Sequence, residues 1–225
     1  MITALRSRAE LELDRFALDP YCKFYLPLWK LDGDSFADHS AYGHLCTNYG
    51  SLWTPQGRSF DGVDDYVDCG NDTSLNITDA ITLEAWVRTS DTSKDDQIIV
   101  GQIDTSIINR NYNLINTFGR IKFEHGDGVN SETFTTNNIV VDGTWQHIVF
   151  TGISKGATKI YVNGVVVKAG ILAYDIVNTT TVQKNIGGWF AGYFNGLIDE
   201  VRIYSRALTP REILDHYIIG KEMFG

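Results

Sequence analysis

The sequence predicts an all-β domain, either a sandwich or a barrel, and three observations lead to this prediction. Apolar and polar residues alternate along many short segments, as in strands that are buried on one face only. Turn residues separate these segments at intervals of about eight to twelve residues, and 21 glycines are available for the turns. Strands do not alternate with helices in the pattern, so a parallel α/β sheet is not expected.

The strand candidates begin after Tyr21 and continue almost to the end of the chain. Each is rich in β-branched or aromatic residues, which suit a pleated, half-buried surface. Asn163-Gly164 and Phe118-Gly119 each separate two candidates at hairpin distance. A type I′ turn needs positive φ twice, which makes Asn-Gly the strongest short hairpin signal. The predicted strands span residues 23–29, 43–48, 65–69, 81–89, 97–103, 111–117, 120–125, 145–152, 158–164, 165–169 and 195–204.

The first twenty residues differ from this pattern and end at Pro20. We expect a short helix or an arm here, with a disordered leader as the alternative. Residues 21–225 contain no repeat and no long linker, so we expect them to form one domain. The apolar residues at roughly helical spacing in the first segment are Leu5, Ala9, Leu13 and Phe16.

A short helix is predicted near the C-terminus. Thr209 is its expected N-cap, Pro210 its first residue, and Glu212 completes a capping box. Gly220 is expected to end it. The side chains predicted to face the domain are Leu208, Ile213 and Tyr217.

Charge and hydropathy argue against two classes of partner, nucleic acids and membranes. The formal net charge is −9 and the pI is about 4.9, so binding to a phosphate backbone is not expected. No run of eighteen apolar residues exists, so membrane insertion is not expected either.

The first residues lack the apolar core of a secretory signal, which predicts cytoplasmic synthesis, with virion association or export without a leader as routes outward. The three cysteines suggest buried thiols, although a pair between Cys22 and Cys46 stays open.

Six segments, taken in order, resemble one known family. They are "RSFDGVDDYVDC" (58–69), "ITLEAWVR" (81–88), "WQHIVFT" (145–151), "IYVNGVVV" (160–167), "NIGG" (185–188) and "NGLIDEVRIYSRALTPREI" (195–213). Together they resemble the laminin-G-like domains of the concanavalin A-like lectin/glucanase superfamily. The resemblance implies a jelly-roll sandwich of two antiparallel sheets with a short C-terminal helix, and ligand-binding loops at the rim of one sheet.

Asp199 is the first candidate site residue. Strict alternation through 195–204 places it on the same face as Leu197, Val201 and Ile203. A carboxylate on an apolar face is costly unless it is paired or bound to a cation. The family resemblance implies a structural calcium ion between Asp199 and an early loop that supplies Asp38 and Ser40. The alternative is that Asp199 accepts hydrogen bonds and holds no metal.

Catalytic residues are not apparent in the sequence. A glycosidase needs two carboxylates about 5 to 9.5 Å apart, which on one strand means acids at alternate positions. Glu84 stands alone in its predicted strand, and Asp199 and Glu200 point to opposite faces. His147 is expected to be a half-buried structural histidine. The sequence therefore predicts a protein that is not an enzyme, with a glycoside hydrolase as the weakest alternative.

The loop "GGWFAGYFNG" (187–196) supplies the candidate ligand site. Trp189, Phe190 and Tyr193 offer rings on which a sugar could stack, and Asn195 offers a polar group beside them. The alternative is that some of these rings pack inward, as expected for Phe194. We therefore predict a non-catalytic, carbohydrate-binding recognition module that contacts a glycan or glycosylated surface.

A structural or adhesion component of a virion or surface assembly is the rival prediction. The absence of a signal peptide favours it, and so does an N-terminal arm that could join copies into a homo-oligomer. Genes flanking this one would separate the two predictions most directly.

Overall fold

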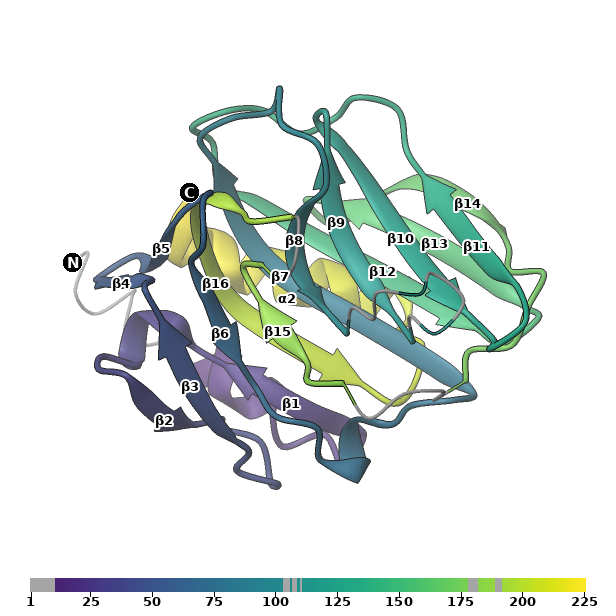
Figure 1. The fold of residues 1–225 in the computed structure, drawn as a ribbon, viewed down its shortest axis with the longest axis horizontal. Coiled ribbons are helices and arrows are strands. Elements are labelled where there is room, and N and C mark those ends of the chain that lie inside the picture. The colour runs from purple at the N-terminus through teal and green to yellow at the C-terminus, as the bar shows by residue number, and fades with distance from the viewer. Residues whose placement is uncertain (1–10, 103–105, 107–108, 110, 178–181, 189–191) are drawn as a thin grey trace.

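The computed structural model describes residues 11–102, 106, 109, 111–177, 182–188 and 192–225. It confirms the predicted all-β sandwich: two eight-stranded antiparallel sheets pack face to face, and a C-terminal helix covers one of them (Figure 1). We call the sheet beneath the helix sheet A and the other sheet B.

Sheet A is built around the two longest strands, β7 and β16, which pair with each other. The last strand of the chain therefore lies at the centre of the sheet, where β1 also pairs with it. In spatial order the strands are β14 (Val165–Ile171), β13 (Ala157–Val162), β12 (Gln146–Ile153), β7 (Ala80–Thr89), β16 (Asn195–Tyr204), β5 (Gly57–Asp61) and β4 (Leu52–Thr54), with β1 (Cys22–Leu26) on β16.

Sheet B brings together strands from residues 35–135 and one short strand from much later in the chain. That short strand is β15, which lies between β6 and β8. In spatial order the strands are β11 (Ser131–Thr135), β10 (Arg120–Gly126), β9 (Asn113–Thr117), β8 (Gln97–Gly101), β15 (Asn185–Ile186), β6 (Tyr66–Asp68), β3 (Leu45–Tyr49) and β2 (Ser35–Ala37).

The core lies between the two sheets, where the inward side chains of both interdigitate, as in other sandwiches. Phe123 of sheet B stacks on Phe150 of sheet A with ring centroids 3.6 Å apart. Fully buried aliphatic residues surround this pair, among them Leu83, Val87, Leu114 and Ile198. This packing fixes which side chains of each strand must point outward.

Both predicted hairpin turns are confirmed. Asn163 and Gly164 have φ values of 53° and 76° between β13 and β14, and Phe118 and Gly119 have 50° and 71° between β9 and β10. Two consecutive residues with positive φ are what a type I′ turn requires.

The C-terminal helix α2 (Pro210–Phe224) starts as predicted but ends later. Thr209 and Glu212 form the predicted capping box. The helix continues past Gly220, and this glycine is buried against the indole of Trp86, where a Cβ would clash. The residue serves close packing rather than termination. The buried helical side chains are Ile213 and His216, while Tyr217 is only half-buried.

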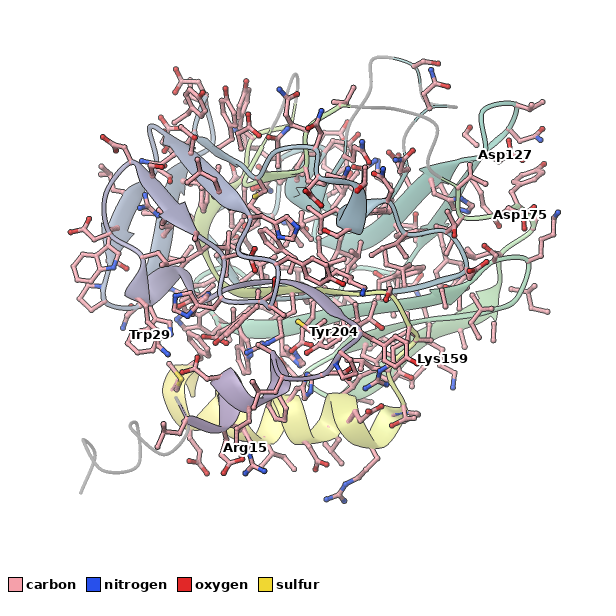
Figure 2. The ribbon with its side chains drawn as sticks, turned by 90° about the horizontal axis from the view of Figure 1, so that it is seen from below. Arg15, Trp29, Asp127, Lys159, Asp175 and Tyr204 are labelled. Atoms are coloured by element: carbon pink, nitrogen blue, oxygen red, sulfur yellow. The ribbon has the colours of Figure 1, made fainter. Side chains whose placement is uncertain are left out.

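In the described part of the N-terminal segment, residues 11–16 are helical. The segment packs against the rest of the same chain. Leu13 and Ala17 are buried, and the ring of Phe16 lies 3.8 Å from that of His216 in α2. Figure 2 shows Arg15 beside α2, below the sandwich. Residues 11–20 thus cover the same sheet as the helix.

Cys22, Cys46 and Cys69 are free and buried. Cys46 of β3 lies near Cys69, which directly follows β6, because their neighbours Thr47 and Asp68 pair with each other. No helix in the described residues is long and apolar enough to cross a membrane.

Candidate ligand-binding surface

Two tyrosines stack on the outer face of sheet B. Tyr49 of β3 and Tyr66 of β6 are direct cross-strand partners, with ring centroids 4.6 Å apart and planes 11° from parallel. Cys46 and Val67 point into the core, so alternation turns both tyrosines outward. Tyr49 is 45% exposed. The pair therefore presents aromatic surface to solvent.

Tyr193 lies close to this pair. Its ring packs over Gly188, which rests against the backbone of Asp65, the residue before Tyr66. Burial raises the pKa of Tyr66, and Tyr49, Asp68 and Tyr193 raise it further. We call Tyr49, Tyr66 and Tyr193 the tyrosine platform.

The structure describes only some of the residues in the predicted ligand-binding loop. Trp189 and Phe190 lie outside the described residues. Tyr193 is half-buried and joins the tyrosine platform, whereas Phe194 is fully buried in the core as expected. Asn195 begins β16, where its backbone N–H donates to Gln97 and its side chain lies beside Gly62.

Sequence reasoning missed Tyr49 and Tyr66. Each ends or begins a short strand, and only the register between β3 and β6 places the rings together. The available signal was alternation: Tyr49 follows inward Cys46 by three residues, and Tyr66 precedes inward Val67 by one.

A row of polar residues crosses the same face. Five neighbouring strands each contribute one residue to this row, and Gly101 interrupts the polar side chains. In spatial order the residues are Asp68, Asn185, Gly101, Asn113 and Glu124. The amides of Asn113 and Asn185 are buried, yet neither has a hydrogen-bond partner within the described part of the chain. Buried amides are normally satisfied, so this row is an exception that calls for an explanation.

A lysine joins two carboxylates beside this row. Lys122 Nζ lies 2.5 Å from Asp96 Oδ1 and 2.9 Å from Glu124 Oε1. Burial alone would lower the pKa of Lys122, but the two acids outweigh burial and raise it. The two acids come from different segments, which is why a search for acids on one strand could not find them.

Three further carboxylates gather at the end of β5. Asp61, Asp64 and Asp65 each place one oxygen within 4.8 Å of the others, so this cluster could hold a metal ion. Asp65 is buried beside Gly50, the neighbour of Tyr49. Burial raises the pKa of Asp65, and its two acidic neighbours add to that increase.

The prediction that Asp199 faces the apolar core is wrong. Glu200 has a φ of 51°, and the register of β16 against β7 shifts between Asp199 and Arg202. This β-bulge rephases the strand, so Ile198, Val201 and Ile203 point into the core. Asp199 instead lies opposite Trp86, on the face covered by α2.

Asp199 is fully buried and only half satisfied. Its Oδ1 accepts the backbone N–H groups of Trp29 (3.3 Å) and Glu200 (2.7 Å). Its Oδ2 has no partner in the residues that the structure describes. The residue lines a cavity of about 170 Å³ together with Gln56 and Arg88. Burial, and then the charge of Glu200, raises the pKa of Asp199 well above its usual value.

Asp38 and Ser40 lie together but in a different environment. Ser40 N–H donates to Asp38 Oδ1 at 2.6 Å, and His44 Nδ1 lies 2.6 Å from Asp38 Oδ2. Burial would raise the pKa of Asp38, but the hydrogen bonds from His44 and Ser40 lower it. Among the described residues, no hydrogen bond or ion pair joins Asp38 to Asp199.

Comparison with known families identifies the fold. Residues 61–214, more than half of the chain, match the laminin-G-type family described as the concanavalin A-like lectin/glucanases superfamily. The chain belongs to this superfamily. The predicted resemblance is therefore confirmed.

Individual relatives of this concanavalin A-like chain are more distant. It is 31% identical over 122 residues to human adhesion G-protein coupled receptor D1, a match that covers 51% of this chain and 14% of the receptor. The botulinum neurotoxin serotype G binding domain aligns with a TM-score of 0.70 and 18% identity, over 88% of this chain and 51% of that one. The chain thus spans only a part of these proteins.

A third relative is a single domain of similar size. Domain 4 of AbnA, an extracellular arabinanase from Geobacillus stearothermophilus, was solved with arabinotriose. It aligns with a TM-score of 0.64 and 19% identity, over 87% of this chain and 98% of that domain. At such identities these solved structures share the fold with our chain.

The superfamily includes glucanases, so the position of Glu84 matters. It lies beneath α2, where Glu84 Oε1 is 2.9 Å from His147 Nε2 and Oε2 is 2.8 Å from His216 Nδ1. Arg202 approaches the same carboxylate at 3.4 Å. Burial would raise the pKa of Glu84, but these cationic and hydrogen-bonding neighbours hold it well below its usual value. His147 is fully buried, more than expected.

Proposed function

We propose that this domain is a non-catalytic carbohydrate-recognition module whose ligand stacks on the tyrosine platform. The observation that carries the proposal is the parallel, outward-facing pair of Tyr49 and Tyr66. Sugar rings expose C–H faces that pack on aromatic rings, while their hydroxyl groups require nearby polar partners. The fold is shared with a domain solved with arabinotriose, which supports this ligand class.

Polar partners are available next to the platform. Asp68 follows Tyr66 on β6 by two residues and so points to the same face. It begins the polar row that continues through Asn185. Asn185 is buried and Asp68 is half-buried, so Asp68 is the group of this row that a glycan on the platform would contact.

Hydrolysis is not part of this proposal. Asp68 and Glu124 are separated by four strand steps, roughly 19 Å at the usual strand spacing, which is too far for a glycosidase pair. Asp96 and Glu124 are closer, but Lys122 binds both. A carboxylate paired with a lysine is a poor general acid because it resists protonation.

A structural calcium ion remains part of the proposal. Asp199 Oδ2 is a buried, unpartnered carboxylate oxygen beside a small cavity, and calcium takes carboxylate, amide and carbonyl oxygens. Gln56 lines the same cavity and offers a further oxygen. Asp38 and Ser40 stay candidate ligands by family resemblance, although His44 already occupies one oxygen of Asp38.

The rival role in a virion or surface assembly receives less support. It was inferred partly from an N-terminal arm that could join subunits. Residues 11–20 instead pack on their own chain, with Leu13 and Ala17 buried. Homo-oligomerisation through this arm is therefore not the use that we favour.

Substitution of the platform tests the proposal. We expect Tyr49→Ala and Tyr66→Ala each to weaken glycan binding by about 1–3 kcal/mol, by analogy with bases that stack on aromatic side chains. The measurement is a glycan array followed by calorimetry with the best ligand and with arabinotriose. Tyr21→Ala is the matched control, because Tyr21 is 52% exposed and lies outside sheet B.

Two outcomes would contradict the proposal. One is an array without any saccharide ligand. The other is unchanged affinity in Tyr49→Ala combined with a loss of several kcal/mol in the free energy of unfolding, which would make the tyrosine a packing residue.

A further inference from the structure

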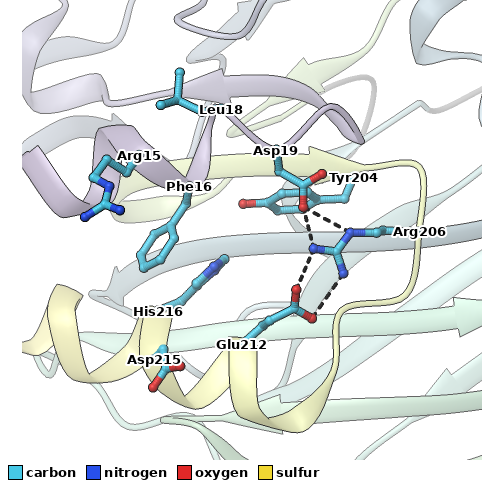
Figure 3. Close-up of a pocket in the computed structure, with 9 residues that line it drawn as sticks. All are labelled: Arg15, Phe16, Leu18, Asp19, Tyr204, Arg206, Glu212, Asp215 and His216. Atoms are coloured by element: carbon cyan, nitrogen blue, oxygen red, sulfur yellow. Dashed lines mark hydrogen bonds and ion pairs between the residues drawn. The ribbon is translucent and has the colours of Figure 1, made fainter.

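A groove lies on the opposite side of the molecule, between the N-terminal segment and α2. Its volume is about 440 Å³, within the range of small-ligand sites. Figure 3 shows the Phe16 ring in contact with His216 at one end of the groove, and Tyr204 and the Arg206–Glu212 pair beside them. The groove is thus built from residues 15–19 and residues 204–216, two segments that are far apart in the sequence.

The floor of the groove carries an unsatisfied hydroxyl group. Tyr204 is 1% exposed, and its hydroxyl has no hydrogen-bond partner among the residues described. Burial, and then the charge of Glu84, raises the pKa of Tyr204 well above its usual value, so the group stays a neutral donor and acceptor. A buried hydroxyl without a partner is unfavourable, and this one is directed into the groove (Figure 3).

The charged residues of the rim already have partners. Arg206 Nε lies 3.0 Å from Asp19 Oδ2, and its Nη2 lies 2.6 Å from Glu212 Oε1. Arg206 lowers the pKa of Glu212 to about 2, so this pair stays ionised at any ordinary pH. The remaining rim charges are paired as well: Arg15 with Glu12, and Asp215 with Arg211.

The unmet chemistry of the groove is therefore neutral. Paired charges do not require a phosphate, a metal ion or a charged peptide end. Phe16 and Leu18 offer apolar surface, and the Tyr204 hydroxyl offers one hydrogen-bonding group. His216 bonds to Glu84 through Nδ1, which leaves Nε2 on the other side of its ring.

We propose that this groove is a second ligand site, which binds one residue of a neutral saccharide with a hydroxyl group on Tyr204. A sugar ring combines an apolar C–H face for Phe16 and Leu18 with hydroxyls that both donate and accept. The site is independent of the tyrosine platform, because it lies on the outer side of sheet A rather than of sheet B.

Nuclear magnetic resonance with isotope-labelled protein tests this site. The probes are D-glucose, D-galactose and L-arabinose, each titrated into wild-type protein and into Tyr49→Ala, which lacks a platform ring. We expect at least one sugar to shift the amide signals of Leu18, Asp19 and Glu212 in both proteins. Persistence in Tyr49→Ala separates the groove from the platform.

Tyr204→Phe removes only the hydroxyl group. We expect affinity at the groove to fall about 3- to 10-fold, the value of one net hydrogen bond, while the melting temperature stays equal or rises. Tyr161→Phe is the matched control, because Tyr161 belongs to the same buried cluster but bonds to Thr151. Its affinity should equal that of the wild type.

Either of two results would overturn the inference. In the first, none of the three sugars shifts the groove amides in Tyr49→Ala. In the second, Tyr204→Phe binds as well as the wild type and melts at a higher temperature, so that the hydroxyl is only an unsatisfied group of the fold.

Discussion

The outer faces of the two sheets both carry buried polar residues, but they treat them differently. Beneath α2, Glu84 is surrounded by His147, His216 and Arg202, each within 3.4 Å. On sheet B, the amides of Asn113 and Asn185 have no partner among the described residues. Both oxygens of the Glu84 carboxylate thus have partners, although His147 Nδ1 and Arg202 Nε beside it have none among the described residues. Paired charges hold strands and helix together, whereas amides without partners add little to the stability of the fold. We call the face beneath α2 the structural face, and the outer face of sheet B, which carries the tyrosine platform, the proposed binding face.

The largest effect should come from removing the centre of the structural face. Glu84→Ala leaves two histidines and an arginine buried without their carboxylate, so we expect a loss of about 3–5 kcal/mol in the free energy of unfolding. Urea denaturation measures this. Glu222→Ala, at an exposed acid of α2, is the control and should change stability by less than about 0.5 kcal/mol. Equal effects of the two variants would remove the basis of the comparison.

Calcium should have the next largest effect, through Asp199. If the ion binds Oδ2, a calcium concentration of 100 times Kd stabilises the native state by about 2.7 kcal/mol, and chelation reverses the gain. Asp199→Asn should abolish this response. It should not destabilise the metal-free protein, because the amide removes a buried charge. Identical melting curves with calcium and with chelator would leave Asp199 without a metal.

Acid should weaken the structural face through His147. Burial lowers the pKa of His147 below 6.5, although Glu84 opposes this shift. The unfolded chain therefore takes up a proton first as the pH falls, so stability decreases below about pH 6.5. The pKa of Glu84 is also lowered, which adds a further loss below about pH 4.5.

The contribution of His147 can be isolated. Its full effect on the slope is about 1.4 kcal/mol per pH unit between its unfolded and folded pKa values. We expect His147→Gln to make the decline between pH 6.5 and 5 shallower by up to this amount, as measured by denaturation at each pH. An unchanged slope would mean that another group takes up the proton.

The smallest effect should appear on the proposed binding face. Asn185→Ala removes an amide that has no partner in the described residues, so we expect stability to change by less than about 1 kcal/mol. Asn111→Ala is the matched control, because Asn111 Nδ2 donates to buried Gln102 at 2.5 Å. Its loss should cost about 1–3 kcal/mol. Similar losses in both variants would show that Asn185 serves the fold.

The sequence predicted the long strands well because alternation persists over many residues. It also predicted the capping box at Thr209, which depends only on local residues. It missed β2, β4, β5, β11 and β15, which have two to five residues and carry too little pattern. Strict alternation also failed at Asp199, since one bulged residue exchanges the two faces of a strand.

The candidate sites were harder to predict than the fold. Tyr49 and Tyr66 become neighbours only through strand register, and Asp96 meets Glu124 only through Lys122. The groove at Tyr204 depends on how two terminal segments pack on one sheet. Such relations are long-range contacts, and local sequence patterns do not encode them directly.

Because both terminal segments pack on sheet A, attaching the domain to a surface through its C-terminus determines which sheet faces the solution. Residues 11–20 and α2 lie on the same side of the sandwich (Figure 2), and the tyrosine platform lies on the opposite sheet. A protein anchored to a chip through its C-terminus would therefore turn sheet B towards the flowing solution. The same anchor would hold the Tyr204 groove near the chip surface. If both proposed sites bind sugar, immobilised and free protein should thus report different numbers of accessible sites.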